Sequence, residues 1–532
     1  MFKLAFVIDS WIRQCQIAWA EGHMKVCRIQ QLQGALQKPN TQLPKLIPQG
    51  LWTPCSFCVL LAALLQLSLP VSLQAQYVYT TNNGSLTITK YTGSGGAVTI
   101  PAAISGLPVT AIADFAFYSL TNLTSVTISQ GITNIGFEAF YSCSRLSSVS
   151  IPTSISSIGD WAFQNCTNLT QIIVVTLNPT YSSLNGVLLD KSQMTLVSYP
   201  AGKAGSYAMP GTVTNIGVGA FGGCLSLTSV SMSNKVMNIG DSAFYSCTRL
   251  GSVTVPDAVT NIGNSAFYSC TSLTSATLGN GVRSIGDYAF SSCNNLVGAT
   301  IGSNVTSIGY GAFSGSGLTN LTIPNSVSKV GDAAFEYCSN LTSISIGNGL
   351  TSIPNFAFDA CTSLTRITMG NAITNIGVDA FGRCARLASV TIPSSVTNIA
   401  DAAFLNCTSL KSVYFLGNAP EAGGSVFGGD SQATVYYLAQ TSGWGPTFGG
   451  LPTAFWNPQI QTGDSSFGVK ANQFGFNIIG PSNLAIVVEA CTNLASPIWS
   501  PVQTNVLTGG SAFFGDPKWT NYRARYYRVR LP

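Results

Sequence analysis

A stretch of 23 residues, IGDSAFYSCTRLGSVTVPDAVTN at 239–261, is followed directly by a near copy, IGNSAFYSCTSLTSATLGNGVRS at 262–284. The two copies share mainly apolar residues and differ mainly at small polar residues, which indicates that burial of the apolar side chains determines which positions are kept. A fixed period of about 20 to 29 residues is typical of a solenoid, in which each unit buries its apolar faces against its neighbours. Twelve units start at Ile112, Ile135, Ile158, Ile216, Ile239, Ile262, Ile285, Ile308, Val330, Ile353, Ile376 and Ile399, spaced by 23 residues except for one interval of 22 and one of 58.

Each unit contains the signals of one strand and one turn. Apolar residues alternate in segments such as Leu227, Val230 and Met232, which predicts a short strand with one face inward. An acidic residue often follows Ile-Gly and precedes Ala-Phe, where its side chain is expected to cap a single helical or 3₁₀ turn. The acidic residues are Asp114, Asp160, Asp241, Asp287 and Asp332.

Ten of the 15 cysteines share one register of the repeat. Equivalent positions on stacked coils lie about 4.8 Å apart with parallel side chains, whereas a disulfide needs Cβ atoms about 3.8 Å apart and turned toward each other. We therefore expect a buried ladder of free thiols, although export would favour some pairing. The ten are Cys143, Cys166, Cys224, Cys247, Cys270, Cys293, Cys338, Cys361, Cys384 and Cys407.

The consensus C-x-x-L-x-x-V-x-I-P-x-x-V-x-x-I-G-x-x-A-F resembles the BspA type, or Treponema pallidum type, of bacterial surface leucine-rich repeat, over residues 112 to about 416. The resemblance implies a leucine-rich repeat solenoid with a parallel β-sheet on the concave side and short helical or 3₁₀ turns on the convex side. It also implies an exported protein, because members of the family are exported and some take part in adhesion. The chain departs from the pattern at Leu120, at a 35-residue insert and at SGSGL, residues 314–318.

The regions outside the repeats have signals of their own. Residues 1–50 are interpreted as a leader or the result of a wrongly assigned start, and residues 51–75 as a signal peptide with cleavage at Ala75; a membrane anchor is disfavoured because the apolar run is short. We expect an N-terminal β-hairpin cap over 76–111 with its turn at Asn83-Gly84. The twelve repeats occupy 112–416, and their insert, at about 174–211, is interpreted as a hairpin that pads a broken coil or as a binding loop. A C-terminal cap and linker over 417–459 and a β-rich, sandwich-like domain over 460–532 follow.

The sequence excludes several kinds of chemistry. The only histidine, His23, lies in the leader, so Ser-His-Asp hydrolysis and His-ligated metal sites are ruled out for the exported chain. Beyond residue 75 the chain has 18 basic and 17 acidic residues, since six of 24 and two of 19 precede it, and this balance gives no footprint for nucleic acid. We predict no cofactor, no metal and no enzymatic activity; a carboxylate-pair glycosidase stays open only formally.

Small polar residues occupy the outward strand positions and suit broad contact with another macromolecule. We predict a secreted or cell-surface protein that binds a protein or a glycan on the concave face, with Arg366 and Tyr414 as anchors. The alternative is a structural spacer about 58 Å long; ice binding is disfavoured because the Thr rows are broken. The last strand is basic, which indicates a solvated edge or contact with an anionic polymer, and carries Arg523, Arg525, Arg528 and Arg530. The candidate ligand-binding residues are Ser229, Ser231, Ser252, Thr254, Ser275, Thr277, Asn320, Ser343, Ser345, Arg366, Thr368, Ser389, Thr391 and Tyr414.

Overall fold

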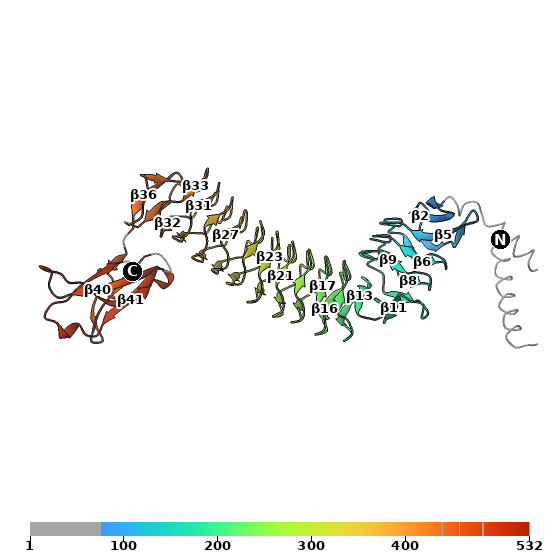
Figure 1. The fold of residues 1–532 in the computed structure, drawn as a ribbon, viewed down its shortest axis with the longest axis horizontal. Helices are drawn as coiled ribbons and strands as arrows, with labels where there is room; N and C mark the ends of the chain where they lie inside the picture. The colour runs from blue at the N-terminus through green and yellow to red at the C-terminus, as the bar shows by residue number, and fades with distance from the viewer. Residues whose placement is uncertain (1–75, 439, 457, 481–483, 531–532) are drawn as a thin grey trace, which may run out of the picture. The chain divides into compact units, whose positions relative to one another are not determined.

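The computed structural model describes residues 76–438, 440–456, 458–480 and 484–530, so the predicted leader and signal peptide lie outside the described residues. Beyond residue 85 the chain forms a β-solenoid of about 15 turns, residues 86–437, and small antiparallel sheets follow it. Figure 1 shows the coils stacked one on the next. The predicted solenoid is confirmed, and each coil contributes to three walls.

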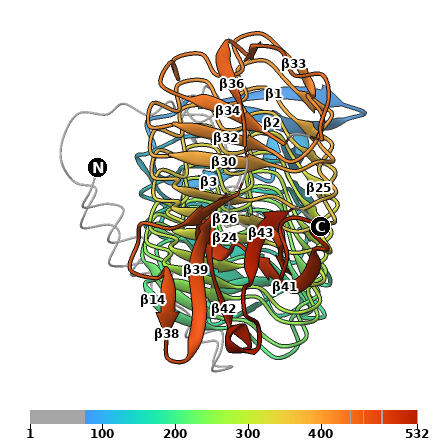
Figure 2. The same cartoon turned by 90° about the vertical axis from the view of Figure 1, so that its left-hand side faces the viewer.

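The long-strand wall holds the strand predicted in each unit, and these strands pair in parallel in five successive groups along the array. In Figure 2, β30, β32, β34 and β36 lie side by side in this wall. Its inward residues are buried and its outward residues face solvent, as in β18, where Val253 is buried between exposed Ser252 and Thr254. The strands are β3 Gly96–Ile100, β6 Leu123–Ile128, β8 Ser148–Ile151, β10 Gln171–Val174, β14 Gly205–Ala208, β16 Leu227–Ser231, β18 Ser252–Thr254, β20 Ser275–Thr277, β22 Gly298–Thr300, β24 Asn320–Ile323, β26 Ser343–Ile346, β28 Arg366–Thr368, β30 Ser389–Ile392, β32 Ser412–Phe415, β34 Thr434–Tyr437 and β36 Leu451–Phe455.

A second ladder, the short-strand wall, forms within the repeats at positions where no strand was predicted. The residue before Ile-Gly and the Ile itself pair in parallel from coil to coil, as Asn238 with Asn261 and Ile239 with Ile262. Side chains extend the ladder, since Asn238 Nδ2 donates to Asn215 Oδ1 at 2.8 Å. The strands are β2 Ser85–Tyr91, β5 Leu107–Ile112, β7 Asn134–Ile135, β9 Ser157–Ile158, β13 Thr195–Ser198, β15 Asn215–Ile216, β17 Asn238–Ile239, β19 Asn261–Ile262, β21 Ser284–Ile285, β23 Ser307–Ile308, β25 Lys329–Val330, β27 Ser352–Ile353, β29 Asn375–Ile376, β31 Asn398–Ile399 and β33 Glu421–Ala422.

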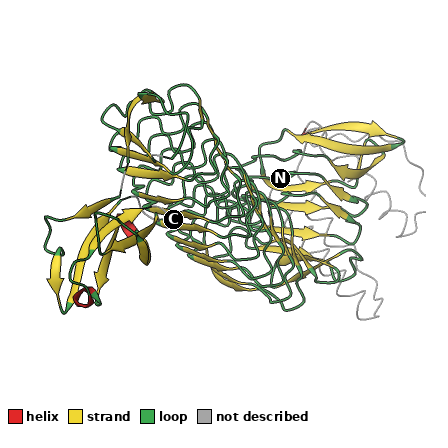
Figure 3. Cartoon of the chain, turned by 60° about the vertical axis from the view of Figure 1, so that its left-hand side comes forward, coloured by secondary structure: helices red, strands yellow, loops and turns green. Residues whose placement is uncertain are grey.

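The third wall, the turn wall, differs from the sequence expectation in one detail. The described coils carry tight turns there instead of helical or 3₁₀ turns, as Figure 3 shows by the loop colour of these segments. Ser242 and Ser246 adopt left-handed backbone angles, with φ of 53° and 56°. Their N–H groups donate to Asn264 O and Tyr268 O on the next coil at 2.7 and 2.8 Å. A helical turn would direct every N–H along its own chain, so the left-handed residues let alternate peptides bond across coils.

The Asp after Ile-Gly needs a correction for the same reason. Asp241 Oδ1 accepts a hydrogen bond from the backbone N–H of Asn264 at 2.7 Å, and Asp287 Oδ1 accepts one from Tyr310 at 2.7 Å. Asn264 Oδ1 accepts from Asp287 in turn at 2.8 Å. The expected cap on the residue's own turn is therefore a link to the following coil, and Asn performs it as well as Asp.

The core between the walls is built from stacked identical side chains. The rings of Phe244 and Phe267 stack with centroids 5.0 Å apart and an angle of 4° between planes. The ten predicted cysteines are free and buried, which confirms the thiol ladder. Each thiol donates to the carbonyl of the preceding coil's aromatic residue, as Cys270 Sγ does to Phe244 O at 3.2 Å.

The insert holds a hairpin and a shortened coil. Strand β11 (Tyr181–Leu184) pairs antiparallel with β12 (Val187–Asp190), which pairs antiparallel with β13 across the DKSQ turn. Strand β13 then joins the short-strand wall, with Leu196 opposite Ile216, and Tyr199 stacks on Phe221 at 5.0 Å. The insert therefore supplies its own substitutes for the repeated Ile and Phe, and the buried side chains divide here into two clusters.

Both ends of the array are covered by added strands. At the N-terminal end β1 (Tyr77–Asn82) pairs antiparallel with β2 across Asn83-Gly84, both with positive φ, and β4 (Ala103–Ile104) pairs with β5. At the other end β35 (Thr447–Phe448) pairs with β36. An additional coil that was not predicted from the sequence precedes β35. In this coil Phe427, 23 positions after Phe404, stacks on Phe404 with ring centroids 5.6 Å apart.

Residues 459–530 form two antiparallel sheets that share a small core including Phe476, Ile486 and Phe514. In one sheet β39 is flanked by β37, β38 and β42; in the other β40 lies between β41 and β43. The strands are β37 Gln459–Gln461, β38 Gly468–Lys470, β39 Gln473–Ile479, β40 Ala485–Cys491, β41 Ser500–Val506, β42 Ser511–Asp516 and β43 Tyr526–Arg530, with 3₁₀ turns η3 Thr508–Gly510 and η4 Trp519–Asn521.

Candidate ligand-binding face

The fourteen predicted binding residues all lie on the long-strand wall at outward positions. None of them is buried: Ser343, Thr368, Thr391 and Tyr414 are half-buried and the other ten are exposed. Their inward neighbours, such as Val253, Ile344 and Val390, belong to the core. The alternation predicted from sequence therefore gives a solvent-facing surface held by a rigid interior.

Parallel pairing arranges these residues in two columns along the array. In the first column Ser252 lies opposite Ser275, and Asn320, Ser343 and Arg366 follow one another on β24, β26 and β28. In the second, Thr254 lies opposite Thr277 and Thr391 opposite Tyr414. We call these the serine column and the threonine column. They extend beyond the prediction, to Ser206 and Ala208 at one end and to Thr434 and Tyr436 at the other.

The hydroxyl groups of these columns are largely free of protein partners. Within the described chain, the side chains of Ser229, Ser252, Thr254, Ser275 and Thr277 make no hydrogen bond to a protein atom, whereas Ser343 Oγ donates to Asn320 Oδ1 at 2.6 Å. The neighbouring hydroxyls one position earlier behave differently, since Thr274 Oγ1 donates to Gly251 O of the preceding coil at 3.0 Å. The array thus separates structural hydroxyls from hydroxyls open to a ligand.

Arg366 and Tyr414 lie near the C-terminal end of this face. They are two coils apart, or roughly 10 Å, and Arg366 is exposed. Tyr414 stacks on Tyr436 with centroids 5.2 Å apart and meets the edge of Trp456 at 6.0 Å. Sequence reasoning missed Tyr436 because it ended the repeats at 416; the recurrence of Phe427 at the repeat spacing could have revealed the extra coil.

Comparison with protein families identifies the repeat. The BspA type Leucine rich repeat region matches residues 99–203, 199–319 and 306–434, which together span more than half of the chain. The chain belongs to the BspA-type leucine-rich repeat family. No protein with a curated description matches it.

Solved structures of bacterial leucine-rich repeat proteins resemble this BspA-type chain. A leucine-rich repeat protein of Bacteroides ovatus is 23% identical, with a TM-score of 0.45 over 72% of this chain and 98% of the other. A leucine rich cell surface protein of Faecalibacterium prausnitzii is 26% identical, with a TM-score of 0.42 over 69% and 94%. The leucine-rich repeat protein of T. pallidum is 20% identical, with a TM-score of 0.15 over 60% and 89%.

Charged groups buried in the BspA-type array serve its packing. Asp359 is fully buried and pairs with Arg383 of the following coil, and burial raises the pKa of Asp359 against the lowering effect of that guanidinium. Burial also raises the pKa of the Cys270 and Cys293 thiols well above the ordinary value, which keeps them protonated and unreactive. The described residues contain no cluster of three or more His, Cys, Asp or Glu able to hold a metal ion.

Three of the four arginines near the last strand have carboxylate partners. Arg528 and Arg530 approach Glu489 at 2.7 and 2.6 Å, and these two arginines lower the pKa of Glu489. Arg525 pairs with Asp516 at 3.1 Å. The described residues include no helix long and apolar enough to cross a membrane.

Proposed function

We propose that this BspA-type protein is exported and acts at the bacterial surface as a binding or adhesion protein. The long-strand wall contacts a protein or glycan partner through its serine and threonine columns. The observation that carries the proposal is the row of outward hydroxyls without protein partners, next to an exposed arginine and an aromatic cluster.

The chemistry of this face fits many shallow contacts. Hydroxyls donate and accept hydrogen bonds, so two columns repeated coil after coil match a polymer or an extended surface. Arg366 adds a fixed charge, and Tyr414 with Tyr436 adds rigid contact area at low cost in side-chain entropy. The described residues contain no histidine, so Ser-His-Asp hydrolysis and His-ligated metal chemistry lack their central residue.

The test is binding of the purified protein to arrays of matrix proteins and of bacterial and host glycans. If a ligand is found, the double variant Arg366→Ala, Tyr414→Ala is expected to bind it at least about tenfold more weakly, because arginine and tyrosine anchors commonly carry most of an interface.

The matched control is Arg283→Ala, Tyr337→Ala, which removes the same residue types from other walls. Arg283 is exposed beside the short-strand wall, and Tyr337 is 56% exposed on the turn wall. Equal loss in both double variants, or no ligand on any array, would instead favour a structural spacer.

A further inference from the structure

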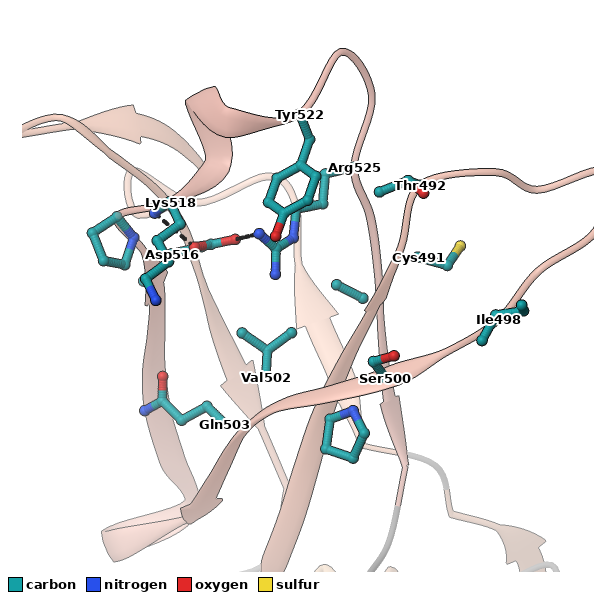
Figure 4. A pocket seen from close by; sticks show the side chains of 14 residues that line it. Cys491, Thr492, Ile498, Ser500, Val502, Gln503, Asp516, Lys518, Tyr522 and Arg525 are labelled. Carbon is teal, nitrogen blue, oxygen red and sulfur yellow. Dashed lines mark hydrogen bonds and ion pairs between the residues drawn. The ribbon is translucent and has the colours of Figure 1, made fainter.

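The C-terminal sheets contain a cavity of about 540 Å³ that the function proposed above does not use. It opens between β40, β41 and the segment from β42 to Arg525, as Figure 4 shows from close by. Charged and aromatic groups, Asp516, Lys518, Tyr522 and Arg525, lie toward one side, and Ser500, Val502 and Gln503 of β41 toward the other.

Both carboxylate oxygens of Asp516 already have protein partners. Asp516 is 2% exposed, and its Oδ1 accepts from the backbone N–H of Lys518 at 2.8 Å while its Oδ2 accepts from the hydroxyl of Tyr527 at 2.8 Å. Oδ2 also lies 3.1 Å from Nη1 of Arg525. These contacts fix the position of the guanidinium and leave Asp516 little capacity for a ligand.

Arg525 keeps donors that the protein does not use. Its side chain is 13% exposed, and its Cζ lies 4.1 Å from the centroid of the Tyr522 ring, which holds the guanidinium plane in place. Nη1 is buried against Asp516 and takes part in that ion pair, and within the described part of the chain the other guanidinium N–H groups make no hydrogen bond to the protein. Figure 4 shows this guanidinium directed into the cavity, so its remaining N–H groups are placed to donate to a ligand there.

We propose that this cavity binds the carboxylate of an acidic sugar, the uronic acid unit of an anionic polysaccharide. The planar fork of arginine matches a carboxylate in two parallel hydrogen bonds. Asp516 offsets the charge of Arg525, so the exposed Lys518 leaves the cavity with one net positive charge. That balance fits a singly charged carboxylate better than a doubly charged phosphate monoester.

The rest of the lining fits a sugar ring. Ser500, Thr492 and the amide of Gln503 offer hydrogen bonds to ring hydroxyls, and Val502 and Tyr522 offer apolar contact to the C–H face. Small-molecule sites combine such apolar lining with a few placed polar groups. This proposal concerns the C-terminal sheets and is independent of the long-strand wall.

The test is calorimetric titration of the purified protein with galacturonate and glucuronate oligosaccharides, with the neutral galactose and glucose oligosaccharides as matched ligands. Uronates are expected to bind and neutral oligosaccharides to bind at least about tenfold more weakly. Arg525→Gln is expected to lower uronate affinity at least about tenfold, and Lys518→Ala severalfold; Arg249→Gln, on the array, is the control. Lys518→Ala keeps the backbone contact to Asp516, so it tests the site even if Arg525→Gln unfolds these sheets. Equal binding of neutral and acidic oligosaccharides, absence of uronate binding, a preference for phosphate, or full affinity in natively folded Lys518→Ala and Arg525→Gln would overturn the proposal.

Discussion

The coils beginning at Ile239 and Ile262 repeat almost the same residues, whereas the coils beginning at Leu196 and Ala422 keep the stacking positions and change their chemistry. In the irregular coils Tyr199 and Phe427 continue the aromatic stack of the regular ones. What changes is the residue at the position that holds a cysteine in the regular coils, here called the thiol register, together with the residues on the turn wall. The stack of rings and the parallel pairs therefore define a coil, and the other positions adapt to what lies above and below.

The thiol register shows how strict that adaptation is. From the coil beginning at Ile216 to the coil beginning at Ile399 the position takes a thiol, or the small hydroxyl of Ser316, whose Oγ lies 3.3 Å from Cys338 Sγ. In the last coil Asp430 takes it, 23 positions after Cys407, and is 3% exposed. Neither of its carboxylate oxygens has a hydrogen-bond partner in the described chain, and burial raises its pKa to about 7. The carboxyl at the end of the stack is therefore neutral below about pH 7.

The largest effect is expected from placing the last coil's residue inside the array. Cys270→Asp puts a carboxyl between the buried thiols of two neighbouring coils, with no cation nearby, and is expected to lower the free energy of unfolding by about 5 kcal/mol. Cys270→Ser, which copies Ser316, is expected to cost about 1 kcal/mol. Urea unfolding followed by circular dichroism measures both. If Cys270→Asp lowers the free energy of unfolding no more than Cys270→Ser does, water reaches this part of the interior.

The reverse exchange, Asp430→Cys, is expected to stabilise the protein in a pH-dependent way. The carboxyl has an ordinary pKa of 3.8 and a pKa of about 7 in the fold. Between these values the unfolded chain binds fewer protons than the folded one, so the stability of the wild type falls as pH rises from about 4 to 7 and is level above. The thiol stays neutral throughout that range. The gain of the variant is expected to grow by about 1.4 kcal/mol per pH unit, to at most about 4 kcal/mol at pH 8.

Urea midpoints at pH 4.5, 6 and 8 check the sign of this effect. The control is Cys270→Ala, in the same register seven coils earlier, whose cost should not change over that interval because neither residue titrates there. A gain that is constant with pH would show that Asp430 is ionised in the fold and that its oxygens reach water.

The regular coils could be predicted because burial repeats with the chain. The inward strand residues, the thiol ladder and the outward columns all follow from alternation and from the constant spacing. The left-handed turn residues could not be predicted, because most of those positions hold Ser, Ala, Tyr, Phe or another non-glycine residue, and glycine occurs at only a few of them, such as Gly219 and Gly311. Asn238 and its equivalents formed an unexpected strand because two residues are too few to show alternation.

The candidate site was predictable in part for the same reason. The serine and threonine columns follow from strand alternation, but their ends depend on coils that lost the repeated letters, so Tyr436 and Ser206 were missed. The cavity beside Arg525 could not be predicted from the sequence, because its contacts join Asp516 on β42 to residues on other strands. Only the fold brings these groups together.

The smallest effect concerns the turn wall, where the shortened coil leaves Trp161 in contact with Gly219. A Cβ at Gly219 would lie 2.0 Å from Trp161 Cδ1, although its φ of 61° is close to the 53° of Ser242 at the equivalent position. Backbone angle alone therefore does not require glycine there. Gly219→Ser is expected to lower the free energy of unfolding by about 1 to 3 kcal/mol through overpacking.

The loss of stability caused by Gly219→Ser should depend on the side chain of Trp161 and on no other residue of the coil. Ser242→Gly is the matched exchange at a regular coil and is expected to change stability by less than about 1 kcal/mol. In the background of Trp161→Ala, Gly219→Ser should become nearly neutral, which a double-mutant cycle measures as a coupling between the two positions. If the serine costs as much without the indole, strain in the left-handed turn explains the glycine. In that case the regular coils, which hold serine at the same φ, would need their hydrogen bonds to the next coil to compensate for the backbone strain at this position.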